Sequence, residues 1–346
     1  MVRTLAICAA LAGALSNSTN ALGQDALKVA AYRPFTSNDR RIVGGTPVKL
    51  AQVPWQVALV HSLKPALDPD GFFCGGSLVA AKWVLTAAHC VFDRANALVK
   101  PKQIDLIIGN DDLGAMPTLR VPASSIIPHP NYDPASNTNE NDLALVGFDS
   151  PAPQEMVVPL ANEQTEAVLL RIPQDPTVTG WGMTATGTIS QVLQRTDVPI
   201  VDLKDCNSKD HYNGLVKDSM ICAGAKNKDA CHGDSGGALV KADSAAVFYQ
   251  IGVVSVGFGC GDPSYPGVYT RVAKYIAWIK SRAAGVIEHR DTIDPIHWSP
   301  AMVAFTNTYS ANRMALLNLI ASQQVSGHNF SYDAAANRII QRAGPD

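Results

Sequence analysis

Cys231-His232-Gly233-Asp234-Ser235-Gly236-Gly237 is the segment from which the architecture of this chain can be inferred. It places one serine among three glycines, directly after an aspartate and four residues after a cysteine. A serine hydroxyl is a weak nucleophile, so acyl transfer needs an adjacent base and backbone N–H groups that bind the developing negative charge. Taken alone, the segment is better explained as a loop of small residues. The chemistry therefore depends on a base and an acid elsewhere in the chain.

Two other segments place a titratable side chain beside an apolar run. His89 follows the run 83–88, and Asp142 opens the run Asp142-Leu143-Ala144-Leu145. Considered singly, His89 is more simply a packed core histidine, and Asn141-Asp142 a turn-forming pair. A buried aspartate nevertheless needs a partner. Together the chain offers a base, an acid and a nucleophile in the order His89, Asp142, Ser235.

These motifs resemble those of the chymotrypsin-like (trypsin-family) serine proteases. The resemblance rests on Thr86-Ala87-Ala88-His89-Cys90, Asp142-Leu143-Ala144-Leu145, Gly233-Asp234-Ser235-Gly236-Gly237 and Ile42-Val43-Gly44-Gly45, and it covers residues 42–285. The chain order histidine, aspartate, serine is that of this family and not that of subtilisins or α/β-hydrolases. The resemblance implies an all-β fold of two six-stranded antiparallel β-barrels, with the active site in the cleft between them and a C-terminal helix.

The resemblance also implies the catalytic roles. His89, Asp142 and Ser235 would form the triad, and the N–H groups of Gly233 and Ser235 would form the oxyanion hole. Ser255 matches the serine beside the triad aspartate. No cofactor and no metal is expected.

The specificity pocket follows from the same resemblance. Asp229 would lie at its floor and Gly257 and Gly267 would form its walls, which favours Arg or Lys before the scissile bond. Ala230 stands where many trypsins have serine, which predicts a modest preference for Arg over Lys. Val256 replaces the usual tryptophan, so contacts with more distant substrate residues should differ. Protein or peptide substrates with Arg or Lys, and protein inhibitors, are the expected partners.

Activation is implied by residues 24–41, which end in Asp39-Arg40-Arg41 before Ile42. Cleavage after Arg41 would free the Ile42 ammonium, and Asp234 resembles the buried carboxylate that pairs with it. Residues 24–41 are therefore interpreted as an activation propeptide.

The cysteine count predicts disulfides. The chain has seven cysteines, of which Cys8 lies in the N-terminal segment that is expected to be removed. The six that remain form an even number, which in an exported chain suggests three disulfides with about 15 alternative pairings. A zinc site is disfavoured because no Cys-x-x-Cys spacing occurs. Only the family resemblance selects a pairing: Cys74 with Cys90, Cys206 with Cys222, and Cys231 with Cys260.

Composition and the N-terminus bear on location. The 346 residues carry a formal net charge of −2, so no basic excess favours nucleic acid or an anionic membrane. Residues 1–23 are typical of a secretory signal, with Arg3 before an apolar stretch too short to span a bilayer. Cleavage after Gly23 and near Ser16 fit almost equally well. We expect a secreted, extracellular protein.

Other segments carry weaker signals. The Pro-rich stretch 150–172 is expected to link two halves, and residues 274–284 to form an amphipathic helix that stops at Gly285. The extension 286–346 matches no family motif; within it, residues 310–323 fit a helix, and Asn329-Phe330-Ser331 is a glycosylation sequon.

Two other functions are compatible with these motifs. A catalytically inactive homologue acting as a binding module would normally have lost a triad member, and none is lost here. An esterase could use the same acyl-transfer groups, but no lipid-binding feature supports it.

Overall fold

The computed structural model describes residues 45–115, 119–183, 188–226 and 228–288, together with the backbone of 329–333 and 338–342. The expected signal peptide, the activation segment and the predicted helix 310–323 lie outside the described residues. The chain divides into a larger unit, residues 1–243 with 248–291, and a smaller one, 244–247 with 292–346.

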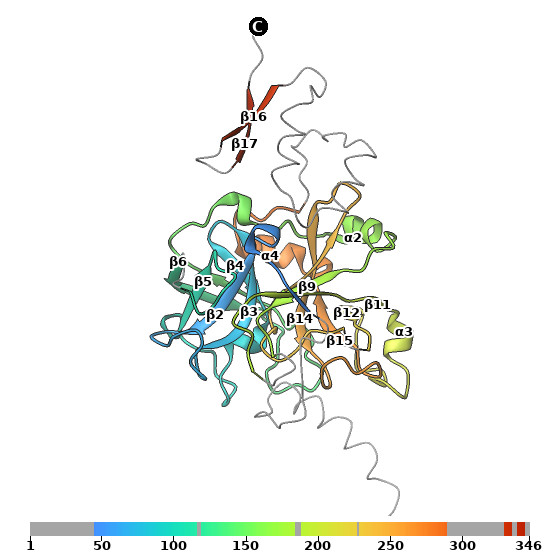
Figure 1. The fold of residues 1–346 in the computed structure, drawn as a ribbon. Coiled ribbons are helices and arrows are strands. Elements are labelled where there is room, and N and C mark those ends of the chain that lie inside the picture. Colours follow the sequence, from blue (N-terminus) through green and yellow to red (C-terminus); the bar gives the residue numbers. More distant parts are fainter. Residues whose placement is uncertain are drawn as a thin grey trace, which may run out of the picture. The chain divides into compact units, whose positions relative to one another are not determined.

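One antiparallel sheet occupies the first half of the larger unit, in the order β6-β5-β2-β3-β4-β8-β7 (Figure 1). Its strands are β2 (Gln56–His61), β3 (Phe72–Ala80), β4 (Trp83–Thr86), β5 (Ile104–Ile108), β6 (Leu119–Pro122), β7 (Ser125–Pro128) and β8 (Ala144–Gly147). The two edge strands, β6 and β7, are consecutive in the chain. Between them, the N–H of Ala123 donates to the carbonyl of Ile104 on β5, and the N–H of Ser124 donates to the carbonyl of Gly147 on β8. These two acceptor strands lie near opposite ends of the strand order. One bent strand therefore closes the sheet into a six-stranded barrel.

The second sheet is closed in the same way, in the order β1-β10-β9-β13-β14-β15-β12-β11. Its strands are β1 (Thr46–Pro47), β9 (Thr177–Gly180), β10 (Gln194–Asp197), β11 (Ile200–Val201), β12 (Met220–Ala223), β13 (Ala238–Ala242), β14 (Phe248–Val256) and β15 (Gly267–Arg271). Only Val198 and Pro199 separate β10 from β11, so these two form one bent strand, and β1 adds a short pairing to its outside. The all-β prediction of two curled antiparallel sheets is confirmed.

The two barrels are joined by buried polar contacts as well as by apolar packing. Ser77 on β3 donates to Gln250 on β14 (2.7 Å), and Thr179 on β9 donates to Gln56 on β2 (2.6 Å). These side chains are almost fully buried, so each hydrogen bond replaces one lost to water. These two hydrogen bonds help to fix the orientation of one barrel against the other, and with it the position of the cleft between them.

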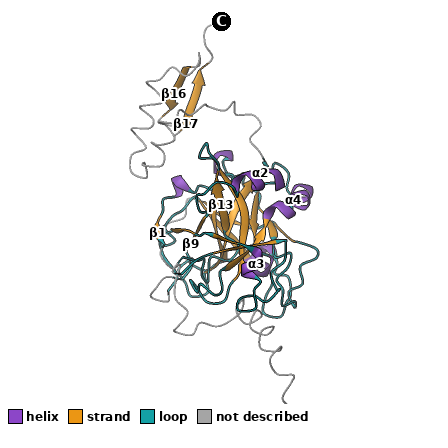
Figure 2. Cartoon of the chain, turned by 90° about the vertical axis from the view of Figure 1, so that its right-hand side faces the viewer, coloured by secondary structure: helices purple, strands orange, loops and turns teal. Residues whose placement is uncertain are grey.

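In the part of the chain that the structure describes, helices are few and lie around the strands (Figure 2). They are α2 (Glu163–Leu169), α3 (Leu203–Cys206) and α4 (Ile276–Arg282), with 3-10 turns η1 (Leu50–Gln52), η2 (Ala88–Val91), η3 (Pro101–Gln103), η4 (Gln154–Met156) and η5 (Val272–Lys274). The predicted C-terminal helix is confirmed as η5 and α4, and Gly285 follows it in the left-handed region (φ 85°). The segment expected to be a linker contains α2, whose first turn is capped by Asn162 accepting from the N–H of Thr165 (2.9 Å).

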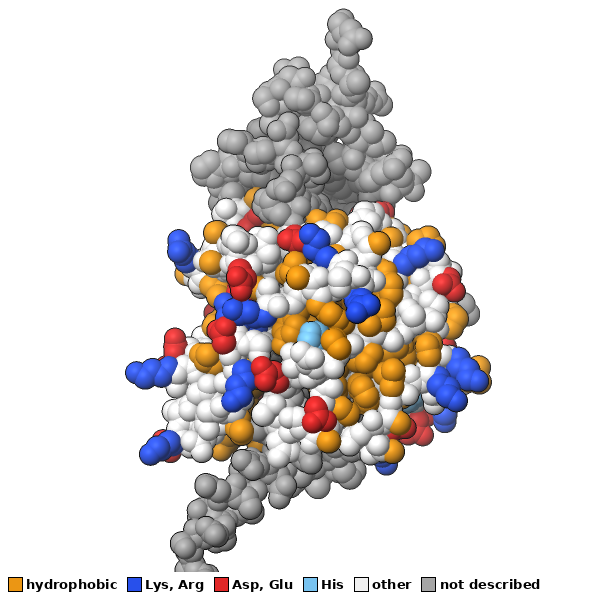
Figure 3. Space-filling view, turned by 180° about the vertical axis from the view of Figure 1, so that it is seen from behind, with side chains coloured by type: hydrophobic (Ala, Val, Ile, Leu, Met, Phe, Trp, Pro, Cys, Tyr) orange, Lys and Arg blue, Asp and Glu red, His pale blue; other side chains and the backbone are white. Residues whose placement is uncertain are grey.

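In the smaller unit, β16 (Asn329–Asp333) and β17 (Arg338–Arg342) form an antiparallel hairpin in which Ser331 pairs with Ile340. The sequon residue Asn329 is the first residue of β16. Among the helices of the described residues, none has the length and apolar character needed to cross a bilayer. On the face drawn in Figure 3, positive and negative side chains are interspersed, in keeping with the small net charge.

Candidate active site

His89 and Asp142 meet because of strand pairing in the first barrel. β4 and β8 are neighbours with Thr86 opposite Ala144, so the residues just beyond these ends lie side by side. Asp142 Oδ2 lies 2.8 Å from His89 Nδ1, and Asp142 Oδ1 accepts from the backbone N–H of His89 (2.8 Å). An ionised carboxylate can only accept, so Nδ1 carries the proton and Nε2 is left as the basic nitrogen.

The second barrel completes the surroundings of the carboxylate. Ser255 on β14 donates to Asp142 Oδ2 (2.6 Å), and the Thr270 hydroxyl on β15 donates to the Asp142 carbonyl (2.7 Å). Asp142 is fully buried. Burial alone would raise its pKa, but His89 and the hydrogen bond from Ser255 outweigh it and hold the pKa below the usual range. Burial alone would lower the pKa of His89, but Asp142 outweighs it and the pKa is raised.

The residue before the aspartate was missed as a site residue in the sequence. Asn141 has φ 61°, in the left-handed region, and its carbonyl accepts from the N–H of Leu143 (2.8 Å). Asparagine is one of the few residues that enter this region readily, so Asn-Asp at the mouth of an apolar strand was a usable signal. Thr270 was also missed, and no local motif distinguishes it.

The Ser235 loop is held by both barrels. The Ser235 carbonyl accepts from the N–H of Gly75 on β3 (2.8 Å), and the N–H of Gly236 donates to Val254 on β14 (2.8 Å). Gly233 has φ 96°, which glycine alone adopts freely. The N–H groups of Gly233 and Ser235 make no hydrogen bond to any described residue. Two donors are thus available beside the serine hydroxyl.

A pocket opens next to Ser235. Its lining includes both predicted wall residues, Gly257 and Gly267, as well as His232 and the Cys231–Cys260 disulfide. Behind Gly267 lies Asp229: a Cβ at Gly267 would stand only 2.7 Å from its Oδ1. Asp229, the predicted floor residue, is not itself among the residues that line the pocket, but it lies directly behind one of them.

Asp229 is a buried and only partly satisfied carboxylate. It is 1% exposed, its Oδ2 accepts from the N–H of Gly261 (3.0 Å), and its Oδ1 has no hydrogen-bond partner among the described residues. Burial, the largest effect, raises its pKa to about 7 despite backbone hydrogen bonds. Such a group is stabilised by a cation that enters the pocket.

Asp234 is a second buried carboxylate on the same loop. Its two oxygens accept from the N–H groups of Gly182 (2.9 Å) and Cys231 (2.9 Å), and no cation among the described residues pairs with it. Burial raises its pKa to about 7. Arg41 and Ile42, the expected activation residues, lie outside the described part of the chain.

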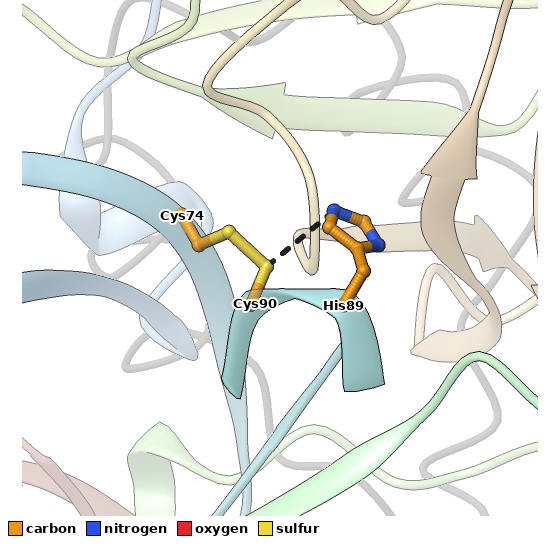
Figure 4. Close-up of side chains that lie close together, drawn as sticks. All are labelled: Cys74, His89 and Cys90. Atoms are coloured by element: carbon orange, nitrogen blue, oxygen red, sulfur yellow. Dashed lines mark hydrogen bonds between the residues drawn. A yellow bond between two sulfur atoms is a disulfide. The ribbon is translucent and has the colours of Figure 1, made fainter. Parts of the chain in front are cut away.

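The three disulfides join the pairs that the resemblance implied: Cys74–Cys90, Cys206–Cys222 and Cys231–Cys260. Figure 4 shows the first of them beside His89, with the Cys90 sulfur 3.7 Å from Nε2. Two cysteines and a histidine this close have the composition of a metal site. The disulfide removes the thiolates that would bind the metal, so this cluster does not suit one.

Comparison with known proteins agrees with this geometry. The family model described as Trypsin matches residues 42–279. The chain is 36% identical to phenoloxidase-activating factor 3 of Holotrichia diomphalia, over 70% of this chain and 72% of that protein. It is 35% identical to Trypsin Blo t 3 of Blomia tropicalis (80% and 96% covered) and 35% identical to Trypsin eta of Drosophila melanogaster (74% and 94%). The chain therefore belongs to the trypsin family and is a serine endopeptidase.

Proposed function

We propose that the protein is an exported endopeptidase that hydrolyses peptide bonds after Arg and Lys and is made as a precursor cleaved after Arg41. The observation that supports this specificity is Asp229, a buried carboxylate behind Gly267 whose Oδ1 has no hydrogen-bond partner within the described part of the chain. A cationic side chain long enough to reach it satisfies that oxygen. An apolar or acidic side chain leaves it unpaired.

The catalytic step follows from the proton on His89. Nε2 takes the Ser235 proton as the hydroxyl oxygen attacks the peptide carbonyl, and the same proton then passes to the leaving amine. Asp142, ionised and hydrogen-bonded, stabilises the charged imidazole. The N–H groups of Gly233 and Ser235 bind the carbonyl oxygen as it becomes negative. Water then hydrolyses the acyl-enzyme by the reverse sequence.

Activation concerns Asp234. A buried carboxylate without a cation is stabilised by a buried ammonium, which is what cleavage after Arg41 would supply through Ile42. The carboxylate lies one residue from Ser235 and shares its loop with Gly233, so this pairing would shape the oxyanion hole. An uncleavable Arg41→Gln precursor should therefore be nearly inactive. Equal activity of the precursor and the form beginning at Ile42 would contradict the activation step.

One experiment tests the activity and the specificity together. The form beginning at Ile42 is labelled with a fluorophosphonate and assayed on matched peptide anilides ending in Arg, Lys and Phe. We expect labelling that disappears in Ser235→Ala, and hydrolysis in the order Arg, Lys, then Phe. Asp229→Ser should retain labelling and lose the Arg preference. Faster cleavage after Phe would refute the pocket assignment, and absence of labelling would favour a binding module.

Export rests on residues 1–23 and is tested separately. Expression of the whole chain in a secreting eukaryotic cell should place the protein in the medium. Its N-terminal sequence there should begin after Gly23 or near Ser16. Retention in the cell with Met1 intact would exclude export by this segment.

A further inference from the structure

We propose that Asn141 is a positioning residue for the catalytic aspartate: its side-chain amide fixes the backbone of Asp142 so that the carboxylate meets His89. This inference rests on the triad roles proposed above. It concerns how the Asp142 carboxylate is oriented, which the sequence motif around Asp142 does not specify.

The backbone at Asn141 adopts a conformation that most residues avoid. With φ 61° it lies in the left-handed region, and its carbonyl accepts from the N–H of Leu143 (2.8 Å), so the chain turns tightly around Asp142. Left-handed residues that persist at functional sites are held there by their surroundings. Here the turn aims the Asp142 carboxylate inward, where it is fully buried.

The side chain of Asn141 is what holds this turn. Its Nδ2 donates to the Asn131 carbonyl (3.1 Å), and its Oδ1 accepts from the Tyr275 hydroxyl (3.1 Å). Asn131 follows β7 in the first barrel, and Tyr275 lies between η5 and α4. The amide therefore ties the aspartate segment to two elements that are distant in sequence. Glycine would allow the same φ but would make neither bond.

The contacts of Asp142 show why its orientation matters. Its Oδ1 accepts from the backbone N–H of His89, while its Oδ2 is shared between His89 Nδ1 and the Ser255 hydroxyl. Hydrogen bonds weaken steeply with misalignment, so a rotation of the segment would weaken these contacts together. The effect of Asp142 on His89 would weaken with them, and the raised pKa of His89 would fall.

Asn141→Gly tests this proposal because glycine permits the same left-handed conformation but lacks the amide; the added backbone freedom is matched in the control below. On an Arg anilide we expect kcat to fall about tenfold, KM to stay within about twofold, and the acid midpoint of kcat/KM to move to lower pH. Asn96→Gly is the matched control, since Asn96 is also left-handed (φ 60°) but lies in an exposed turn. It should leave all three quantities unchanged.

Tyr275→Phe supplies an independent variant, because it removes one anchor and leaves Asn141 in place. It should lower kcat about two- to threefold, and adding it to Asn141→Gly should cause no further loss, as for two residues of one network. The proposal is overturned if Asn141→Gly keeps wild-type kcat and acid midpoint, or if the two substitutions have additive effects. Failure of the proposed function is distinguishable, because the wild-type protein would then show no Arg hydrolysis.

Discussion

At the scale of single residues, two buried aspartates on one loop contrast with Asp142, the proposed acid of the triad. Asp142 is fully buried, yet its pKa is lowered, because His89 and the Ser255 hydroxyl contact its carboxylate. Asp229 and Asp234 are equally buried but receive only backbone donors, and burial raises the pKa of each to about 7. The same type of side chain therefore differs in its tendency to ionise. The carboxyl of Asp142 is stabilised in its ionised form by its present neighbours, whereas those of Asp229 and Asp234 would need a cation nearby.

Benzamidine, a small cation, should report on Asp229. Binding requires the ionised carboxylate, so affinity should rise about tenfold per pH unit up to about pH 7 and then level off, with one proton released on binding at lower pH. Titration calorimetry on Ser235→Ala in buffers of different ionisation enthalpy measures both quantities. Asp229→Asn should bind weakly at every pH. An affinity that does not change between about pH 5.5 and 8 would contradict the raised pKa.

At the scale of elements, the sequence predicted what depends on local pattern. The all-β class, the C-terminal helix and the order His89, Asp142, Ser235 could be inferred because apolar runs and motifs are contiguous. The bent strands β6–β7 and β10–β11 could not be inferred from local pattern. They close each sheet into a barrel by joining its two edges, and these edges meet only in the folded chain. Helix α2 was hidden by prolines around it. The Asn141-Asp142 pair was visible in the sequence, but it was interpreted only as a turn former, because the contacts of the Asn141 side chain with Asn131 and Tyr275 exist only in the folded chain.

The loop 62–71 between β2 and β3 carries a strained residue whose replacement should stabilise the protein. Leu63 has φ 68° and is 97% exposed, so its side chain gains almost nothing from packing. Left-handed backbone costs a leucine about 1 kcal/mol, and asparagine tolerates it better. Leu63→Asn should raise Tm by about 2–4 °C in a thermal melt. Leu98→Asn, at an exposed leucine without positive φ, should not, and equal shifts would refute the strain.

The disulfide between β3 and η2 should affect catalysis as well as stability. Cys74–Cys90 and Cys206–Cys222 each span 16 residues, so loop entropy assigns each about 3 kcal/mol of unfolding free energy. Only the first adjoins His89. Replacing either pair by alanine should therefore lower stability to a similar extent, measured by urea unfolding. Specific activity of the folded fraction should fall only without Cys74–Cys90, and equal activity of the two variants would contradict a role for this bridge in holding η2.

At the scale of the whole molecule, the raised pKa values of Asp229 and Asp234 would couple the proposed activation to stability. Between the unfolded pKa of 3.8 and about 7, the folded chain in which neither carboxyl has a cation binds more protons than the unfolded chain, so its stability falls as pH rises through that window. Each carboxyl contributes on the order of 2 kcal/mol to the loss between about pH 5 and 8. Pairing with the Ile42 ammonium would lower the pKa of Asp234 and would remove the contribution of Asp234 to this loss of stability.

We therefore expect the free energy of unfolding to depend on pH more steeply in the uncleaved protein than in the protein cleaved after Arg41. Urea unfolding of Arg41→Gln/Ser235→Ala precursor at about pH 5 and pH 8 should show the full loss, because both carboxyls lack a cation. Ser235→Ala protein cleaved after Arg41 should show about half of it, since only Asp229 still titrates. Asp234→Asn in the precursor should reproduce the smaller slope without cleavage. If precursor and cleaved protein lose the same stability, Asp234 does not receive the new terminus, and activation must act on another part of the molecule.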